Sequence, residues 1–178
     1  MPAFSSFLPG LAGVKGIPMW TFYTNRGQGM NSFGIDNKGN AIMEFNSANT
    51  AFENTTVKGF RTFLKIDGEY YEPFFKYEKE AKRQIRMNKN SFKIIETNEK
   101  YGIEVTVNYF ILPNESIGAL IRQVSVKNIS DKAKDVEIID GLPKIITYGI
   151  SNGEFKEMSN LFKSWAYIKN IDNKVPYY

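Results

Sequence analysis

Short runs of alternating apolar and polar residues fill most of the chain. The longest run lies at 103–111, where apolar side chains occupy every second position from Ile103 to Ile111. Three polar residues, Glu104, Thr106 and Asn108, fall between them. A period of two places alternate side chains on opposite faces of an extended backbone, so this run predicts a β-strand with one buried face.

Similar runs predict further strands, and turn-forming residues separate them. We expect these strands at 19–24, 31–36, 41–45, 60–66, 69–74, 91–96, 119–128, 135–140 and 163–171. Asp67-Gly68, between two of the runs, is the strongest hairpin signal in the chain. Roughly 9–11 strands at hairpin spacing, without a long amphipathic helix, predict an all-β fold, an antiparallel β-sandwich that forms a single domain over residues 1–178.

Three segments do not fit this alternation. Glycine and proline interrupt residues 1–18, which we expect to be irregular, and the polar segment 48–56 resembles a loop. The basic stretch 76–87 has the composition of a short helix, yet apolar residues alternate in it from Gln84 onward. It is therefore either a short helix or an edge strand.

The composition limits the chemistry that the chain can perform. Its 178 residues are 42% hydrophobic, which is typical of one domain with a packed core. Its 14 Phe and 10 Tyr fit either the core of a β-sandwich or an aromatic surface that stacks on sugars or bases. Cys and His are absent, which excludes disulfides, thiolate nucleophiles, Ser-His-Asp triads and most zinc sites. We expect no metal and no cofactor.

The charge distribution is only mildly basic. The net charge is +4, from 23 basic and 19 acidic residues, and the basic side chains concentrate at 76–89. That stretch is either a solvated face or a contact for an anionic partner. No aromatic RNA-binding motif accompanies it, so we expect no nucleic-acid partner.

Neither a membrane span nor a secretion signal is evident in the sequence. No run approaches the ~20 apolar residues of a membrane span. The first residues lack the basic start and the long apolar core of a signal peptide. We therefore expect a cytoplasmic protein without a membrane partner.

Acidic residues that could act in pairs lie on two of the predicted strands. Glu69 and Glu72 form one pair, Asp135 and Glu137 form another, and Asp140 follows the second pair. A glycosidase needs two carboxyl groups that face each other across a cleft, about 5–9 Å apart. Residues two apart on a strand point outward from the same surface, so we interpret these acids as solvated strand faces.

The segment Asn25-Arg26-Gly27-Gln28-Gly29 interrupts an aromatic stretch with a cluster of hydrogen-bond donors. The two glycines permit positive φ angles and a close approach of the backbone. The side chains of Asn25, Arg26 and Gln28 could bind hydroxyl groups or an anion, and they are our candidate substrate-binding residues. The alternative is a bulged hairpin in which Arg26 pairs with a neighbouring acid.

Several of these motifs together resemble a known family of enzymes. The stretches that carry the resemblance are NRGQGMNSFGI, NKGNAIMEF, GFRTF and YFILPNESIGALIRQVSVKNIS. They resemble the amino-terminal domain of the inverting β-glucan phosphorylases, the relatives of cellobiose phosphorylase in glycoside hydrolase family 94, with the 1,2-β-oligoglucan phosphorylases as the most similar branch. The resemblance covers nearly the whole chain.

The resemblance implies a fold and a role. It implies a large β-sandwich (a supersandwich of the galactose-mutarotase type) that is not itself catalytic. In the family an (α/α)6 barrel follows and carries the general-acid aspartate, and inorganic phosphate attacks the anomeric carbon with inversion to release α-glucose 1-phosphate. The sequence contains no such barrel, and its apolar end, with Val175, Tyr177 and Tyr178, leads us to expect the amino-terminal fragment of a larger multidomain enzyme.

The implied partners are a β-glucan oligosaccharide and inorganic phosphate, both bound through the barrel. The resemblance further implies that this domain packs on the barrel, lines its substrate cleft and takes part in a homodimer. The loop with Asn25, Arg26 and Gln28 is our candidate for the part that reaches the cleft. The alternative function is a free-standing carbohydrate-binding β-domain.

Overall fold

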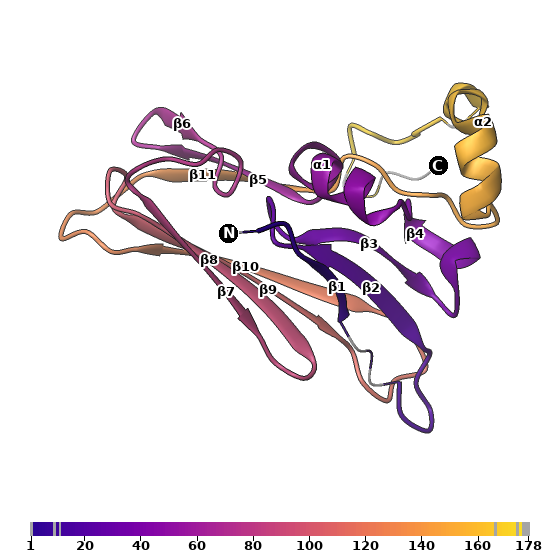
Figure 1. Ribbon diagram of the computed structural model, residues 1–178. Helices are drawn as coiled ribbons and strands as arrows, with labels where there is room; N and C mark the ends of the chain where they lie inside the picture. Colours follow the sequence, from indigo (N-terminus) through magenta and orange to yellow (C-terminus); the bar gives the residue numbers. More distant parts are fainter. Residues whose placement is uncertain (1, 9, 11, 166, 174, 176–178) are drawn as a thin grey trace.

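The fold is all-β, with three antiparallel sheets that form a sandwich (Figure 1). The computed structural model describes residues 2–8, 10, 12–165, 167–173 and 175. Eleven strands lie within this part of the chain, which agrees with the number that the sequence predicts. None of the helices in the described residues is long and apolar enough to cross a membrane.

Each sheet is built from strands that are close in the sequence, with one exception. The N-terminal sheet has the order β1 (Ser5–Leu8), β2 (Met19–Thr24), β3 (Met30–Ile35) and β4 (Ala41–Met43). The long sheet has the order β10 (Leu120–Asn128), β9 (Ile103–Ile111), β8 (Ser91–Asn98) and β7 (Ala81–Met87). The short sheet has the order β11 (Val136–Gly141), β5 (Arg61–Ile66) and β6 (Glu69–Tyr71), so a late strand pairs with an early hairpin.

The sheets stack around one core. Figure 1 shows the short sheet above the long sheet and the N-terminal sheet beside them. The alternation in β9 is confirmed, because Ile103, Val105, Val107 and Tyr109 are at most 1% exposed and face this core. Aromatic rings also join the N-terminal and long sheets: the ring centroids of Tyr23 and Phe92 lie 4.4 Å apart in a stacked pair.

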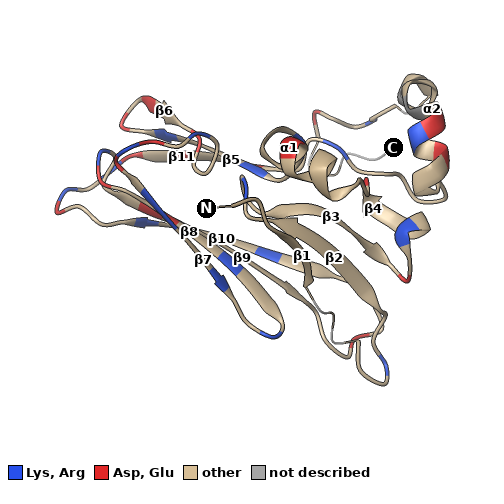
Figure 2. Ribbon diagram, in the orientation of Figure 1, with Lys and Arg blue, Asp and Glu red and all other residues tan. Residues whose placement is uncertain are grey.

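The N-terminal sheet is covered on both faces. Its four strands contain no charged residue, as Figure 2 illustrates, and nearly every residue of β2 and β3 is buried. One face meets the core, and the helix α1 (Ala48–Lys58) packs against β2 and β3. A 3-10 turn, η1 (Lys38–Asn40), precedes β4, and the helix α2 (Asn152–Trp165) contacts it.

Four predictions of local structure are wrong. Residues 48–58 form α1 and not a loop, residues 5–8 form a strand that pairs with β2, and residues 163–165 end α2 and not a strand. The helix α1 buries only Ala51 and Thr55, so it has no apolar stripe that the sequence could display. The prediction that the chain lacks a long helix fails with α2, which spans 14 residues with a kink at Met158.

The basic stretch 76–87 contains an edge strand, which is one of its two predicted alternatives. Residues 81–87 form β7, which pairs with β8 at the edge of the long sheet. Lysine and arginine on an edge strand discourage pairing with other chains, which explains a basic composition that otherwise suits a helix.

A buried arginine connects all three sheets. Arg122 of β10 forms an ion pair with Asp140 of β11 and donates a hydrogen bond of 2.5 Å from Nη2 to Oε1 of Gln28. Its guanidinium carbon lies 4.8 Å from the ring centroid of Phe60. Thr62 of β5 completes the group, because its hydroxyl donates to Asp140 at 2.5 Å and accepts from Nε2 of Gln28 at 2.9 Å. Asp140 is partly exposed, as expected for an acid on a solvated strand face, and its carboxylate also pairs with Arg122, which the sequence did not indicate.

A second polar group joins the short sheet to the long sheet. The carboxylate of Glu96 in β8 is 1% exposed and accepts hydrogen bonds from Tyr71, from Arg83 and from the backbone N–H of Phe74. A buried carboxylate is tolerated when its lone pairs are satisfied in this way. The short sheet is thus held to the long sheet at two separate positions.

Burial makes the stability of the fold sensitive to alkaline pH. Burial raises the pKa of Tyr109 to about 12, although the positive charge of Arg122 partly opposes this rise. The pKa in the unfolded chain is about 10, so the stabilisation is complete below pH 10 and disappears as the pH rises from about 10 to about 12. Phenylalanine has no group that titrates, so between pH 8 and pH 12 we expect Tyr109→Phe to lose about 2–3 kcal/mol less of its free energy of unfolding than the unmodified protein does. Urea titration across this pH range measures the difference. Identical pH dependence in the two proteins would contradict the assignment.

Candidate functional site

Two glycines shape the loop that the sequence singled out. The backbone N–H of Thr24 donates to the carbonyl of Gly29 at 2.8 Å, and the N–H of Gly29 donates to the carbonyl of Arg26 at 2.9 Å. Gly27 and Gly29 have φ angles of 53° and 83°, in the region that favours glycine. A Cβ at Gly29 would lie 2.2 Å from the ring of Phe92, so the second glycine also lets this buried ring approach.

The three candidate side chains of this loop point to different surroundings. The carboxamide of Asn25 holds the start of the chain: it accepts from the N–H of Phe4 at 2.9 Å and donates to the carbonyl of Pro2 at 2.7 Å. Gln28 is 3% exposed and points into the core, where it meets Thr62 and Arg122. The structure therefore does not bring Asn25, Arg26 and Gln28 together around one point.

Arg26 is the outward-facing member of the three. Its guanidinium carbon lies 5.2 Å from the ring centroid of Phe52 in α1. It forms no ion pair or side-chain hydrogen bond within the described part of the chain. Its partner is therefore an aromatic ring and not the acid that the bulged-hairpin alternative predicts. Stacking on a ring leaves the N–H groups of a guanidinium free to bind oxygen atoms of a ligand.

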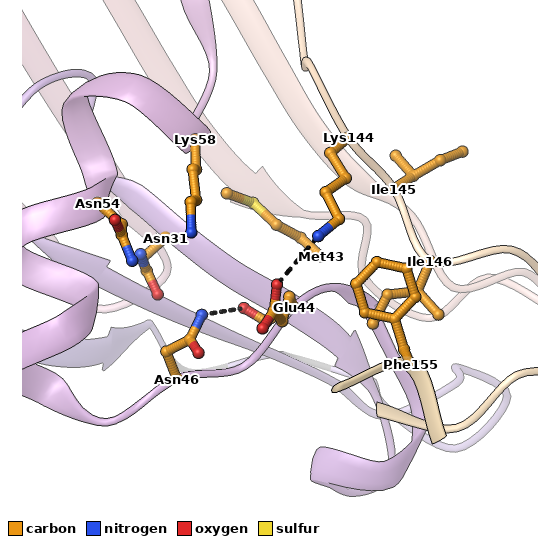
Figure 3. Close-up of a pocket in the computed structure, with 10 residues that line it drawn as sticks. All are labelled: Asn31, Met43, Glu44, Asn46, Asn54, Lys58, Lys144, Ile145, Ile146 and Phe155. Atoms are coloured by element: carbon orange, nitrogen blue, oxygen red, sulfur yellow. Dashed lines mark hydrogen bonds and ion pairs between the residues drawn. The ribbon is translucent and has the colours of Figure 1, made fainter. Parts of the chain in front are cut away.

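A small recess lies on the far side of α1 from this loop, and the sequence did not indicate it. Figure 3 shows it between α1, the end of β4, and the strap, which we define as residues 142–151 between β11 and α2. The polar residues that line it are Asn31, Glu44, Asn46, Asn54, Lys58 and Lys144, and the apolar ones include Met43, Ile146 and Phe155. The lining residues come from positions 31 to 155, so no local sequence motif could predict the recess.

The strap and α2 are fixed beside the recess by a few specific contacts. The backbone N–H of Ile146 donates to the carbonyl of Ile42 at 2.7 Å, and the N–H of Phe45 donates to Oδ1 of Asn152 at 3.0 Å. Phe155 is buried with Ile146 in a small apolar cluster on this side of β4. These contacts give the recess a rigid apolar wall.

The charged groups of the recess differ in their partners. Nζ of Lys144 lies 3.4 Å from Oε2 of Glu44 and 4.2 Å from the ring centroid of Phe155. Lys58 has no carboxylate partner among the residues that the structure describes. The recess therefore offers one ion pair and one further ammonium group.

Asn31 is the unusual residue of this recess. It lies in β3 and is 3% exposed. Its Nδ2 donates to the carbonyl of Ala51 at 3.2 Å and to the hydroxyl of Thr55 at 3.4 Å. Its Oδ1 is buried and has no hydrogen-bond partner. Because buried polar atoms are nearly always satisfied, this acceptor is a candidate to bind a donor that enters the recess.

Among the other acids that the sequence singled out, Glu69, Glu72 and Glu137 form ion pairs within the protein. Glu72 accepts two hydrogen bonds from Arg61, at 2.7 and 2.8 Å, and Glu137 lies 2.7 Å from Nζ of Lys65. Within the described part of the chain, no group of three or more acidic side chains is arranged to hold a metal ion.

Comparison with known proteins identifies no family for this chain. No family model matches it, and no curated protein matches it either.

A substitution at Gly29 has two costs, the collision of its Cβ with Phe92 and the strain of a positive φ angle. A comparison with Gly68 separates the two. Gly68 has a similar φ of 90°, yet nothing lies within 4 Å of a Cβ placed there. We expect Gly29→Ala to lower the free energy of unfolding by about 1–3 kcal/mol more than Gly68→Ala does, because only the first alanine collides with a buried ring. Urea denaturation of both variants measures this difference. Equal losses in the two variants would mean that Phe92 moves aside freely.

Proposed function

We propose that the chain is the non-catalytic β-sandwich domain of an inverting β-glucan phosphorylase and that it binds a β-linked gluco-oligosaccharide through the loop around Arg26. In this proposal the reaction itself, phosphorolysis to α-glucose 1-phosphate, takes place on the separate catalytic barrel. This domain lines the cleft, packs on the barrel and contributes to a homodimer, and the enzyme acts in the cytoplasm.

The observation that carries the proposal is the state of Arg26. Its guanidinium stacks on Phe52 and has no hydrogen-bond acceptor within the described residues, and the neighbouring Asn25 lines an open groove along β7. Sugar hydroxyls accept hydrogen bonds from such planar donors. Gln28 acts as a positioning residue, because its hydrogen bonds with Thr62 and Arg122 hold the loop in place from its buried side. The resemblance of NRGQG and its flanking motifs to the phosphorylase family supports the same assignment.

Titration with a sugar tests this proposal on the chain itself. One wall of a cleft binds weakly, so we expect millimolar binding of a β-1,2-linked gluco-oligosaccharide, detected as NMR shift changes at residues 24–29. Arg26→Ala should weaken this binding by about tenfold, because a hydrogen bond from a charged group contributes about 1.5–3 kcal/mol.

The matched control is Arg86→Ala, since Arg86 is an exposed arginine of β7 whose side chain bonds to Gln84 on the same strand. We expect it to leave the affinity unchanged. Absence of shift changes around residues 24–29, or equal losses in the two variants, would contradict the proposal. Formation of glucose 1-phosphate by the chain alone would contradict its non-catalytic part.

A further inference from the structure

We propose that the recess of Figure 3 is a second binding site, and that it takes a hydroxyl group of a neutral, polyhydroxylated ligand such as a sugar. This site is separate from the loop around Arg26 and shares no lining residue with it. The inference therefore stands independently of the proposed phosphorylase role.

The unpartnered Oδ1 of Asn31 sets the first requirement on the ligand. Its amide orientation is fixed, because Nδ2 already donates to Ala51 and Thr55. The buried oxygen therefore accepts a hydrogen bond from any group that enters, and the ligand must bring a donor. Hydrogen phosphate carries an O–H donor, but its negative charge would face the carboxylate of Glu44.

The lysines set the second requirement. Lys58 points toward the recess from α1 in Figure 3, and Lys144 approaches from the strap. Lys58 is exposed and has no acidic partner in the described residues, so its ammonium group is available to an acceptor on the ligand. A cationic ligand would meet two ammonium groups and a single carboxylate. A hydroxyl both donates and accepts, so it can bind Asn31 and Lys58 together.

The dimensions of the recess agree with this chemistry. The recess is small: about 20 Å³ of it is open to the centre of a water-sized group, which is room for one hydroxyl. A sugar would thus insert one hydroxyl beside Asn31 and keep its ring at the mouth, where Ile145 is 48% exposed.

Three ligands of different charge test the assignment. We expect glucose, added to the full chain at up to 100-millimolar scale, to shift the NMR signals of Asn31, Asn54 and Lys58, whereas inorganic phosphate and methylammonium leave them unchanged. Lys58→Met should weaken the glucose effect at least tenfold, because it removes a charged donor from an exposed helix end. Lys156→Met is the matched control, since Lys156 is an exposed lysine of α2 outside the recess, and it should have no effect.

A second variant addresses the buried acceptor. Asn31→Leu should abolish the glucose effect, and its thermal unfolding shows whether the domain remains folded. Phosphate binding that depends on Lys58 would overturn the proposal in favour of an anion site. Absence of any shift at the recess with all three ligands would overturn it in favour of a recess that holds only water. Neither outcome changes the test at Arg26, which concerns different residues.

Discussion

The ion pair between Arg122 and Asp140 is the interaction on which the arrangement of the three sheets depends. Arg122 belongs to the long sheet, Asp140 belongs to the short sheet, and Gln28, which accepts a hydrogen bond from the same guanidinium, lies in the loop between β2 and β3 of the N-terminal sheet. The side chain of Arg122 is only 9% exposed. A buried charge of this kind is costly unless it is paired and hydrogen-bonded, and here Asp140, Gln28, Thr62 and Tyr109 accept hydrogen bonds from all three guanidinium nitrogens. The group therefore stabilises one relative placement of the sheets more than it adds overall stability.

The helix α1 contacts both proposed binding regions and connects them to the sheets. Thr55 is fully buried, and its hydroxyl accepts hydrogen bonds from Thr24, next to the Arg26 loop, and from Asn31 in the recess. Phe52 on the same helix supports Arg26, and Lys58 lies at its last turn. The strap that closes the recess begins where β11 ends, just after Asp140. Both regions are thus built around α1, and the strap completes the recess.

The sequence predicts the sheets well because their signal is local. The alternation at 103–111 and the turn at Asp67-Gly68 depend only on neighbouring residues, and both appear in the structure. The helix α1 could not be predicted in this way, because it is held by the hydroxyl of Thr55 and not by an apolar stripe. For α2 a local signal existed: Ser151 and Glu154 form a reciprocal capping pair with the spacing of a capping box.

The binding regions were predictable only in part. The glycines and donors of residues 25–29 marked an unusual loop, but the inward direction of Gln28 depends on Arg122, which lies 94 residues away. The recess has no signal in the sequence, because its unpartnered oxygen on Asn31 exists only after β3, α1 and the strap have met.

The most direct measurement is native-state hydrogen exchange of Arg122→Met, with Lys82→Met, which removes an exposed ion pair of β7, as the control. Loss of one partner from a buried ion pair costs about 3–5 kcal/mol. We predict that the backbone amides of β11 lose protection in Arg122→Met more than those of β9, and that Lys82→Met exchanges like the unmodified protein. Unchanged protection of β11 in Arg122→Met would contradict the claim that this arginine holds the three sheets together.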